Sequence, residues 1–508
     1  MGIIKVSLFF KLIVLTVLLL GSFSVVAQDN LLYTTIDNAK KMRDAGDLEQ
    51  AADVLKKFNN QYPGNIWIQC LYAETLFWLN DYEEAILVYE EAINTHPDDF
   101  DVKYEYALML FNVEEYSKAR ELLLVYVNKY PEVAEAETLL GTIDYYLGDF
   151  IPAVEHLEKS LELNPTDKNT AQLLKDVYLI TKPWVNVNFA YNHDSQNITR
   201  LSPIIEGGIF KSAAFSPSFY LDLQNLSVDS TKSNQINFLI QNRFLFNKIG
   251  LKAKVGVGVN YNTNIQLTDL LWDIVLEQKI TKKLSFIGGS RRSAYIYTVA
   301  SLSNPLLSNK YNLSLEWNKQ KSWWAKAGYL AEVFPDANNV QTYYAWALAP
   351  AIKFSVFELR LGYAFNYANS KESRFESVES KEDIINNWQE DEKIEGVYDP
   401  YFTPNNQFSN SALGIILITP SPKFNIKLHA TVGFYAKTMN PYFYLDNNND
   451  GELEVIPDFY QESFTPLDLG INLNFDLSNN LNLNFSYDYL QTFYFNSNNL
   501  QLGLKMYF

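Results

Sequence analysis

Cysteine is nearly absent from the sequence. Cys70 is the only cysteine in 508 residues, which excludes an intramolecular disulfide and a zinc site built from several thiolates. It lies in the stretch WIQCLYAETLFWL, whose apolar spacing predicts a helix. We therefore expect Cys70 to be a buried small residue rather than a reactive thiol.

Positive charge and histidine are also scarce. The formal net charge is −18, and because binding to phosphates requires a cationic surface, we expect no nucleic-acid partner. The four histidines have no spacing to a serine and an acidic residue that would signal a nucleophilic centre. We therefore expect no catalytic residues, and the chain is not predicted to be an enzyme.

Long apolar runs are confined to the start of the chain. Lys5 and Lys11 precede an apolar stretch from Leu12 to Leu20, and small residues lead to a cleavage site after Ala27. This order predicts a secretory signal peptide over residues 1–27, with an uncleaved anchor as the alternative. No later stretch is apolar over the roughly 18 residues that a membrane helix needs, so none is expected.

A 34-residue repeat follows the signal segment. Four columns of residues recur at this interval: prolines, alanines, larger apolar residues, and a column of alanine or glycine. Their members are Pro63, Pro97, Pro131 and Pro165; Ala51, Ala85, Ala119 and Ala153; Leu48, Tyr82, Tyr116 and Phe150; and Ala39, Ala73, Ala107 and Gly141. Small residues let two antiparallel helices cross closely, and a proline beyond the second helix stops it.

These columns resemble a tetratricopeptide array. The units would span about residues 32–65, 66–99, 100–133 and 134–167, a closing helix would span 168–181, and the repeat domain would span 28–182. Such arrays present a concave face to protein partners. The helical period by itself accounts for the aromatic residues, so Trp67 and Trp78 are expected in the core rather than in a ligand platform.

After Pro183 the hydrophobic period changes to two. Val185, Val187 and Phe189 alternate with Asn186 and other residues, and about sixteen segments of this kind follow up to the end of the sequence. A soluble sandwich would alternate in the same way. The period therefore predicts strands but leaves the architecture open.

Three features favour a membrane-spanning barrel. Aromatic residues gather near the ends of the apolar faces, as at a membrane interface. Short turns alternate with longer polar loops, the longest at about 369–405 and 438–463. Sixteen strands starting near Trp184 return the C-terminus to the side where the barrel begins. The predicted fold is an N-terminal all-α tetratricopeptide solenoid followed by a C-terminal transmembrane antiparallel β-barrel of about 16 strands over residues 183–508, a size that encloses a channel.

The last segment of the sequence is NLQLGLKMYF. Leu500, Leu502, Leu504, Met506 and Phe508 fall on one face of a strand. We expect this strand to pair with the first one, which removes both sheet edges, and its apolar face to meet outer-membrane lipid. The terminal Phe508 resembles the signal read by the barrel assembly machinery.

The order of signal peptide, repeats and barrel resembles exopolysaccharide export porins, of the cellulose synthase operon protein C type and the poly-N-acetylglucosamine exporter. The run YDPYFTPNNQFSNSALGI is similar to one that opens a barrel strand in the cellulose exporter, with Tyr401, Pro404 and Phe408 at matching positions. The array of four units is shorter than in those exporters, and YaiO-type barrels also carry short arrays.

The resemblance implies an outer-membrane pore that exports a polysaccharide, with the repeats in the periplasm docking protein partners or guiding the polymer. The alternative is a non-transporting outer-membrane anchor whose repeats scaffold periplasmic partners. The two readings share the fold and differ in whether the barrel conducts.

If the apolar residues face lipid, the alternate residues face the channel. On the clearest strands this set holds three carboxylates, Glu316, Glu332 and Glu358, and seven cations, Arg243, Lys252, Lys254, Lys326, Arg360, Lys427 and Lys505. The excess of cations predicts a basic lumen that concentrates an anionic polymer or solute. Ion pairs that only brace the wall are the alternative.

Two loops hold further candidates. DNNNDGELEVIPD begins like a calcium loop, in which Asp446, Asn448 and Asp450 would supply oxygen ligands and Glu452 its carbonyl, although Pro457 stands where a glutamate is usual. A solvated turn rich in asparagine is the alternative. The acidic 369–405 loop is expected either to fold into or over the pore or to be a disordered surface loop, and SKEDIINNW within it predicts a helical turn.

Overall fold

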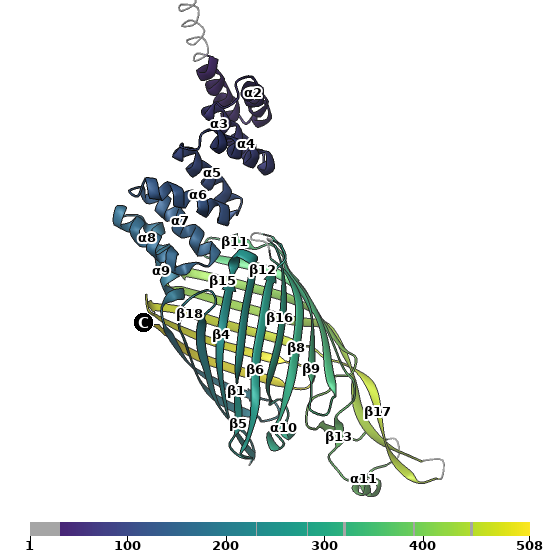
Figure 1. Cartoon of the computed structure of the whole chain (residues 1–508). Coiled ribbons are helices and arrows are strands. Elements are labelled where there is room, and N and C mark those ends of the chain that lie inside the picture. Colours follow the sequence, from purple (N-terminus) through teal and green to yellow (C-terminus); the bar gives the residue numbers. More distant parts are fainter. Residues whose placement is uncertain (1–30, 230, 282, 319–321, 390–391, 448–450) are drawn as a thin grey trace, which may run out of the picture. The chain divides into compact units, whose positions relative to one another are not determined.

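The computed structural model describes residues 31–508, apart from 230, 282, 319–321, 390–391 and 448–450. The predicted signal peptide, residues 1–27, lies outside the described residues. The chain divides into two compact units, of which the first ends at Leu174 and the second begins at Lys175. Figure 1 shows helices in the first unit and a barrel of strands in the second. This division falls within helix α9 (Lys168–Thr181), so the predicted domain boundary at residue 183 stays a prediction.

The first unit is a row of helices. Residues 31–44 are helical, and the helices that follow are α2 (Leu48–Gln61), α3 (Ile66–Trp78), α4 (Tyr82–Thr95), α5 (Phe100–Asn112), α6 (Tyr116–Lys129), α7 (Ala134–Leu147), α8 (Phe150–Leu163) and α9 (Lys168–Thr181). Each predicted 34-residue unit therefore holds two helices, and α9 follows the fourth. The bounds of the four repeats stay a prediction. Among the described residues, no helix is both long and apolar enough to cross a membrane.

The repeated columns occupy the positions that close helix packing requires. Ala85 and Ala153 are fully buried. A Cβ atom on Gly141 would lie 2.7 Å from Leu157 Cγ and 3.2 Å from the carbonyl oxygen of Ala153, so α7 and α8 cross at a contact that leaves no room for a side chain. Each column proline stands two residues beyond the end of a helix, where it breaks no intrahelical hydrogen bond.

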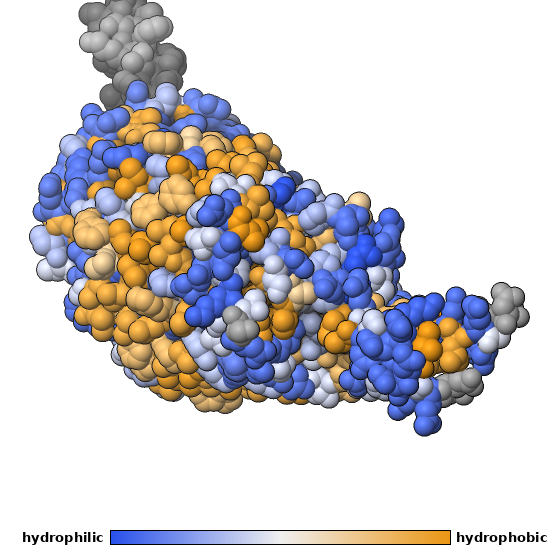
Figure 2. All heavy atoms as spheres, turned by 90° about the horizontal axis from the view of Figure 1, so that it is seen from below, coloured by the Kyte–Doolittle hydropathy of each residue, from blue (hydrophilic) through white to orange (hydrophobic). Residues whose placement is uncertain are grey.

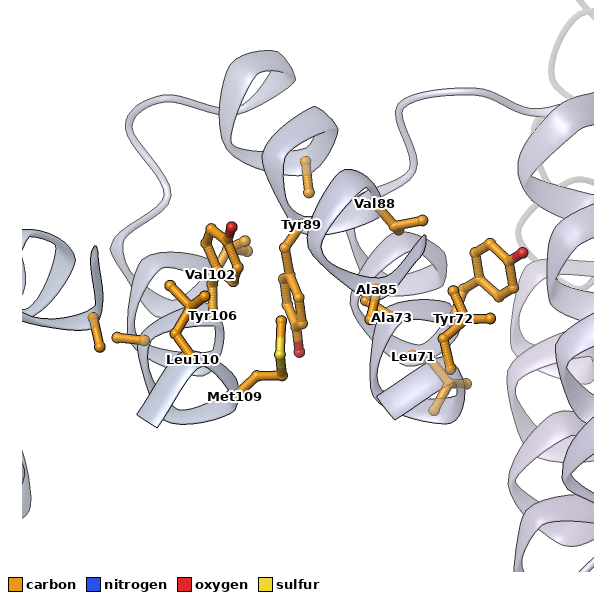
Figure 3. Close-up of a cluster of buried hydrophobic side chains, with 14 of the residues drawn as sticks. Leu71, Tyr72, Ala73, Ala85, Val88, Tyr89, Val102, Tyr106, Met109 and Leu110 are labelled. Carbon is orange, nitrogen blue, oxygen red and sulfur yellow. The ribbon is translucent and has the colours of Figure 1, made fainter. Parts of the chain in front are cut away.

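Tyrosines contribute to the core between the second and third repeats, as Figure 3 shows. Tyr89 of α4 stacks on Tyr106 of α5, with ring centroids 5.1 Å apart, and Met109 lies beside Tyr89. Both tyrosine rings are almost completely buried. Because each ring removes a large apolar area from water, these contacts stabilise the stacking of one repeat on the next.

Sixteen of the described strands form a closed antiparallel barrel. They are β1 (Trp184–Asp194), β2 (Thr199–Gly208), β3 (Ser216–Val228), β4 (Thr231–Phe246), β5 (Leu251–Asn262), β6 (Leu267–Lys279), β7 (Leu284–Tyr295), β8 (Leu306–Asn318), β9 (Trp324–Val333), β10 (Asn339–Leu348), β12 (Phe357–Ser370), β15 (Gln407–Ser421), β16 (Phe424–Asn447), β18 (Leu467–Ser478), β19 (Leu481–Gln491) and β20 (Asn496–Tyr507). The predicted strand number and the predicted start near Trp184 are confirmed.

The last strand closes the barrel. β20 pairs with β1 along their whole length, from Trp184 opposite Tyr507 to Asp194 opposite Ser497. The expectation that the two chain-end strands pair is therefore confirmed, and the closure leaves no free edge in the ring. The amide of Phe508 donates a hydrogen bond to the carbonyl of Pro183 at 2.9 Å, and the phenyl ring is exposed. The role of Phe508 as an assembly signal stays a prediction.

The two rims of the barrel differ in their connections. We call the rim at Trp184 and Tyr507 the terminal rim and the opposite one the loop rim. The terminal rim carries short turns at 247–250, 281–284, 318–322, 353–356, 419–424 and 477–480, of which 282 and 319–321 are not described. The loop rim carries residues 296–305 with helix α10 (Val299–Ser303) and the long segment 371–406.

The predicted loop at 438–463 is instead an extension of the sheet. Strand β16 runs for 24 residues, and β17 (Leu453–Ser463) pairs with its second half. The cross-strand neighbours Tyr442 and Tyr460 have ring centroids 5.7 Å apart. Aromatic pairs of this kind stabilise a hairpin even when most of its other residues are polar, which is why polarity alone wrongly indicated a loop.

The wall of the barrel has an apolar outer face and a more polar inner face. On β5, Val255, Val257 and Val259 are exposed, whereas the alternate residues Asn260 and Asn262 are buried. Figure 2 shows the broad hydrophobic area that such exposed residues form on the outer wall. A wall that is apolar outside and polar inside is typical of barrels that lie in lipid and hold water.

Candidate functional site in the barrel

The ten charged residues predicted to line the channel all lie on the inner face, and Glu332 of β9 faces Lys310 of β8 there. Residues that pair directly across two neighbouring strands lie on the same face of the sheet. Arg243 on β4 pairs with Lys254 on β5, and Glu316 on β8 pairs with Lys326 on β9. The full set is Arg243, Lys252, Lys254, Glu316, Lys326, Glu332, Glu358, Arg360, Lys427 and Lys505. That these residues form a substrate path stays a prediction.

Four of the seven predicted cations have carboxylate partners in the wall. The paired atoms are 2.6 Å apart in Lys254–Asp273, 3.1 Å in Arg360–Glu358, 3.5 Å in Lys326–Glu316 and 3.9 Å in Lys252–Glu277. The ammonium group of Lys505 lies 4.7 Å from the ring centroid of Trp184. Within the described part of the chain, Arg243 and Lys427 form no ion pair.

The inner face also holds carboxylates that the sequence analysis did not place there. They include Glu206, Asp222, Asp273, Glu277, Asp468 and Asp488. Asp273 was missed because its inward neighbours Leu271 and Val275 are apolar, so the strand has no clean alternation. Cations and carboxylates are interleaved, and the predicted excess of cations is not found. Most of these residues form ion pairs within the wall, which is the alternative that the sequence left open.

A cavity of about 270 Å³ lies on the inner face over strands β2 to β7. Leu239 and Leu271 are buried together against Tyr220 and give the cavity an apolar lining. Between them runs β5, where a Cβ atom on Gly258 would clash with the carbonyl of Phe238. The backbone of β4 therefore leaves no room for a side chain at this position of the inner face.

One wall of this cavity contains a buried carboxylate of which one oxygen has no hydrogen-bond partner among the described residues. The side chain of Asp222 is 4% exposed, and its Oδ2 accepts hydrogen bonds from Tyr220 Oη at 3.2 Å and from Gln224 Nε2 at 2.6 Å. Among the described residues, neither Asp222 Oδ1 nor Gln224 Oε1 has a hydrogen-bond partner. Across the cavity, Lys254 and Arg291 both bind the carboxylate of Asp273.

Loops from opposite sides of the barrel meet across the loop rim. The ring of Tyr297, between β7 and β8, stacks on that of Phe495, between β19 and β20, with centroids 6.4 Å apart. Gln196, in the loop after β1, donates a hydrogen bond from Nε2 to the carbonyl of Tyr297 at 3.0 Å. Because β7 and β8 lie half-way around a ring of sixteen strands from β19 and β20, these contacts cross the mouth and narrow it.

The long segment 371–406 contributes a deeply buried aromatic side chain at the mouth. Tyr401 is 1% exposed, and its ring lies parallel to that of Phe334 with centroids 3.5 Å apart. Its hydroxyl donates to Asp336 Oδ2 at 2.6 Å, and Arg374 Nη2 lies 2.7 Å from the same oxygen. The amide of Phe402 donates to Tyr295 Oη, from the inner face of β7, at 3.1 Å. The Tyr401 segment is thereby fixed inside the mouth.

The protonation states of Asp336 and Tyr401 favour the hydrogen bond that holds the Tyr401 segment in the mouth. Burial alone would raise the pKa of Asp336, but the hydrogen bonds from Tyr401 and Arg374 outweigh it and lower that pKa below its usual range. Burial, followed by the bond to Asp336, raises the pKa of Tyr401 to about 12, so the hydroxyl keeps its proton and donates it.

Only part of the acidic loop occupies the mouth, and the expectation of a disordered surface loop is wrong for its described residues. Residues near Tyr401 occupy the mouth, whereas helix α11 (Lys381–Asn387), the predicted helical turn, packs through Ile384 against Ile394 and Leu445 of the β16–β17 extension. β13 (Phe375–Ser377) and β14 (Gly396–Tyr398) form a small separate sheet. The described part of the loop is therefore folded. β15 begins at Gln407, so the Tyr401, Pro404 and Phe408 run does open a strand.

The calcium prediction is left untested. Asn448 and Asp450 lie outside the described residues, Asp446 belongs to β16, and Glu452 precedes β17. In the described ranges, no three His, Cys, Asp or Glu side chains are grouped so that they could hold a metal ion. A calcium site here stays a prediction.

The helical unit contains a second cavity, of about 420 Å³, along α3 and α5. Trp67 and Trp78 line it and are 71% and 46% exposed, so the expectation that they belong to the core is wrong. Helix α3 is apolar on both faces, and only one of them packs in the core. Cys70 is partly buried at this cavity, and burial, followed by Glu105, raises the pKa of its thiol well above the usual range.

Comparisons with known proteins support the helical part directly. The tetratricopeptide repeat family model matches residues 80–143. The chain is similar to a structure described as a bacterial polysaccharide outer membrane secretin, with a TM-score of 0.45 and 8% identity over 65% of this chain and 99% of that one. It is also similar to MamA from Desulfovibrio magneticus RS-1, with a TM-score of 0.27 and 21% identity over 28% of this chain and 82% of that one. A comparison with curated proteins finds no match. The chain thus carries tetratricopeptide repeats followed by a closed sixteen-strand β-barrel.

Proposed function

We propose that this protein is an outer-membrane pore that exports a secreted polymer, a polysaccharide, and that its repeats lie in the periplasm, where they dock partner proteins or guide the polymer. The observation that carries the proposal is a closed sixteen-strand wall with an apolar outer face and a polar inner face. Barrels of this strand number are wide enough to hold an aqueous channel, whereas eight-stranded barrels fill with side chains.

The inner face also favours a hydroxyl-rich polymer over a strongly charged one. Its charges are interleaved as ion pairs, such as Lys254 with Asp273, and amide side chains such as Asn260 and Asn484 lie between them. A wall of this kind offers many hydrogen-bond donors and acceptors without a large net field. The order of repeats and barrel, which resembles exopolysaccharide export porins, supports the same function.

A second candidate is an outer-membrane anchor whose repeats recruit periplasmic proteins without transport. It is favoured by the contacts across the loop rim, such as Tyr297 on Phe495, which narrow the mouth. A pore would have to open these contacts, whereas an anchor would keep them permanently.

Conductance separates the two functions. The purified chain in a planar lipid bilayer should open channels if it is a pore, and should leave the bilayer insulating if it is an anchor. In cells, loss of the gene should abolish the secretion of a polymer. Complementation with a variant that lacks residues 28–182 would show whether the barrel without the repeats restores secretion. A barrel that never conducts and a secreted polymer that is unaffected would refute the export function.

A further inference from the structure

We propose that the cavity over β2 to β7 is a binding subsite for a sugar ring, that is, for a hydroxyl-bearing ligand without negative charge. The inference rests on the proposed export function for the source of the sugar, which would be one unit of the passing polymer. Binding itself is measurable without transport, so the two proposals fail separately.

The buried side chain of Asp222 indicates a ligand that donates hydrogen bonds. Its Oδ2 is already bonded to Tyr220 and Gln224, while Oδ1 has no partner among the described residues. Gln224 uses its Nε2 for Asp222, and its Oε1 is open too. Buried acceptors are rarely left without a donor because their lost hydration is not replaced. Both side chains line the same cavity, and the hydroxyl groups of a sugar are suitable donors.

Charge decides which sugars fit. Within the described part of the chain, no lysine or arginine is in ion-pair distance of Asp222 or of Glu206, which lines the same side of the cavity. Lys254 and Arg291 face them across the cavity but already bind Asp273. Arg292 also lines the cavity and lies 3.7 Å from Asp269. On the side of Asp222 and Glu206, the two carboxylates without a cation in ion-pair distance disfavour a uronate or another anionic unit, because like charges repel. They tolerate a neutral or amino-bearing ring.

The shape of the cavity suits one ring. Leu239 and Leu271, packed with Tyr220, provide an apolar surface for the C–H face of a sugar, while polar groups surround it. The volume of about 270 Å³ lies just below the range of roughly 300–1,000 Å³ that is typical of pockets for drug-sized ligands. A few polar groups around an apolar base are the usual composition of a small-molecule site.

Asp222→Asn tests this arrangement with almost no change in shape. The donors on Tyr220 and Gln224 hold the amide oxygen in the place of Oδ2, so the amide NH₂ takes the place of Oδ1. The amide NH₂ can donate a hydrogen bond but cannot accept one from a hydroxyl group of the ligand. Binding of the sugar should therefore be weaker. Asp476→Asn is the matched control, because Asp476 lies on the inner face of β18, where it accepts a hydrogen bond from Asn482 at 2.9 Å.

The experiment uses the full chain in detergent and isothermal titration with three probes: maltohexaose, hexagalacturonate and a glucosamine hexamer. We expect maltohexaose and the glucosamine hexamer to bind the wild type at least tenfold more tightly than hexagalacturonate. Asp222→Asn should weaken maltohexaose about tenfold, and Asp476→Asn should leave it unchanged. Glucose is titrated at the same concentration of sugar rings as maltohexaose. The comparison of the two affinities shows whether the cavity binds a free sugar or a segment of a chain more tightly.

A second variant protects the test against a folding defect. Gly256→Ala does not touch Asp222, but its added Cβ would lie 2.8 Å from Gln241 Cγ, a side chain that lines the cavity, so it should weaken maltohexaose several-fold by narrowing the space. Circular dichroism confirms that each variant is folded. The subsite is overturned if no probe binds, if hexagalacturonate binds most tightly, or if folded Asp222→Asn binds maltohexaose like the wild type. Normal binding by a chain that exports no polymer would instead refute the export function alone.

Discussion

The contact of Tyr401 with Asp336 gives a prediction about the mouth of the barrel. Tyr401→Phe removes the hydroxyl that donates to the carboxylate at 2.6 Å and leaves the ring on Phe334. Tyr401→Ala removes the ring as well. If these contacts keep the loop segment inside the mouth, both changes should loosen it, and the second should loosen it more.

The structure sets the size of the effect. A hydrogen bond to a charged group contributes about 1.5–3 kcal/mol, which corresponds to a rise of roughly 10- to 150-fold in the population of the open segment. Truncating a fully buried aromatic ring to alanine costs about 3–5 kcal/mol, because the apolar contacts are lost and a cavity remains. The amide of Phe402 is a local probe, since it donates to Tyr295 Oη and exchanges with solvent only when the segment opens.

Hydrogen exchange measured by mass spectrometry would follow this amide, and single-channel conductance would report the width of the mouth. Tyr401→Phe should raise the exchange rate of the segment at least tenfold, and Tyr401→Ala should also raise the conductance. Tyr363→Phe is the control, because the hydroxyl of Tyr363 donates to Asn410 and its ring is exposed on the outer face. Unchanged exchange in both Tyr401 variants would show that the segment is held by other contacts and would refute the reasoning.

The same contact has a defined pH dependence. Because the pKa of Asp336 is lowered in the folded chain, its contribution to holding the segment is complete above its unfolded pKa of about 3.9 and is lost as the pH falls through the lower folded value. Exchange of the Phe402 amide, corrected for its intrinsic pH dependence, should therefore be constant from about pH 5 to 7 and increase only below about pH 4. An increase that begins near pH 6 would point to another titrating group.

Three further predictions test other parts of the molecule. Asp273→Asn leaves Lys254 and Arg291 without their shared carboxylate, so the reversal potential in a KCl gradient should shift toward the equilibrium potential of chloride. An unchanged reversal potential would show that these groups do not face the conducting path. Gly141→Val should destabilise the helical unit by about 1–3 kcal/mol, seen as a lower urea midpoint of its helical signal, and a midpoint equal to that of the wild type would contradict the close crossing of α7 and α8. The Cys70 thiol should react with a disulfide reagent at pH 8 at least a hundredfold more slowly than free cysteine, because its raised pKa leaves little thiolate, and rapid labelling would disprove this.

The sequence predicted those features that depend on regular spacing. Helices that pack on their sequence neighbours need small residues at each crossing, so Ala85 and Gly141 recur at the repeat length and indicate the array. A strand between lipid and water needs an apolar residue at every second position, as in Val255 and Val257, and this alternation indicated the number of strands.

Prediction from the sequence was wrong where the contacts of a residue, and not its spacing, decide its place. The β16–β17 extension is polar enough to look like a loop, but cross-strand aromatic pairs such as Tyr442 with Tyr460 make it a hairpin. Trp67 and Trp78 have the helical spacing of core residues, yet α3 is apolar on more than its packed side, and both side chains remain exposed. Periodicity says that a face is apolar, and it does not say whether a neighbour covers that face.

The spacing of residues was thus enough to predict the helical array, the strands and their order along the chain, because these follow from a period of 3.6 or 2 and from contacts between sequence neighbours. The pairing of the last strand with the first was expected for a different reason, since it removes both sheet edges. The ion pairs of the inner face, the burial of Asp222 and the narrowing of the mouth could be learned from the folded chain alone. These features depend on strand register and on contacts between loops far apart in the chain, such as Tyr401 with Asp336, and no local pattern of residues encodes such distances.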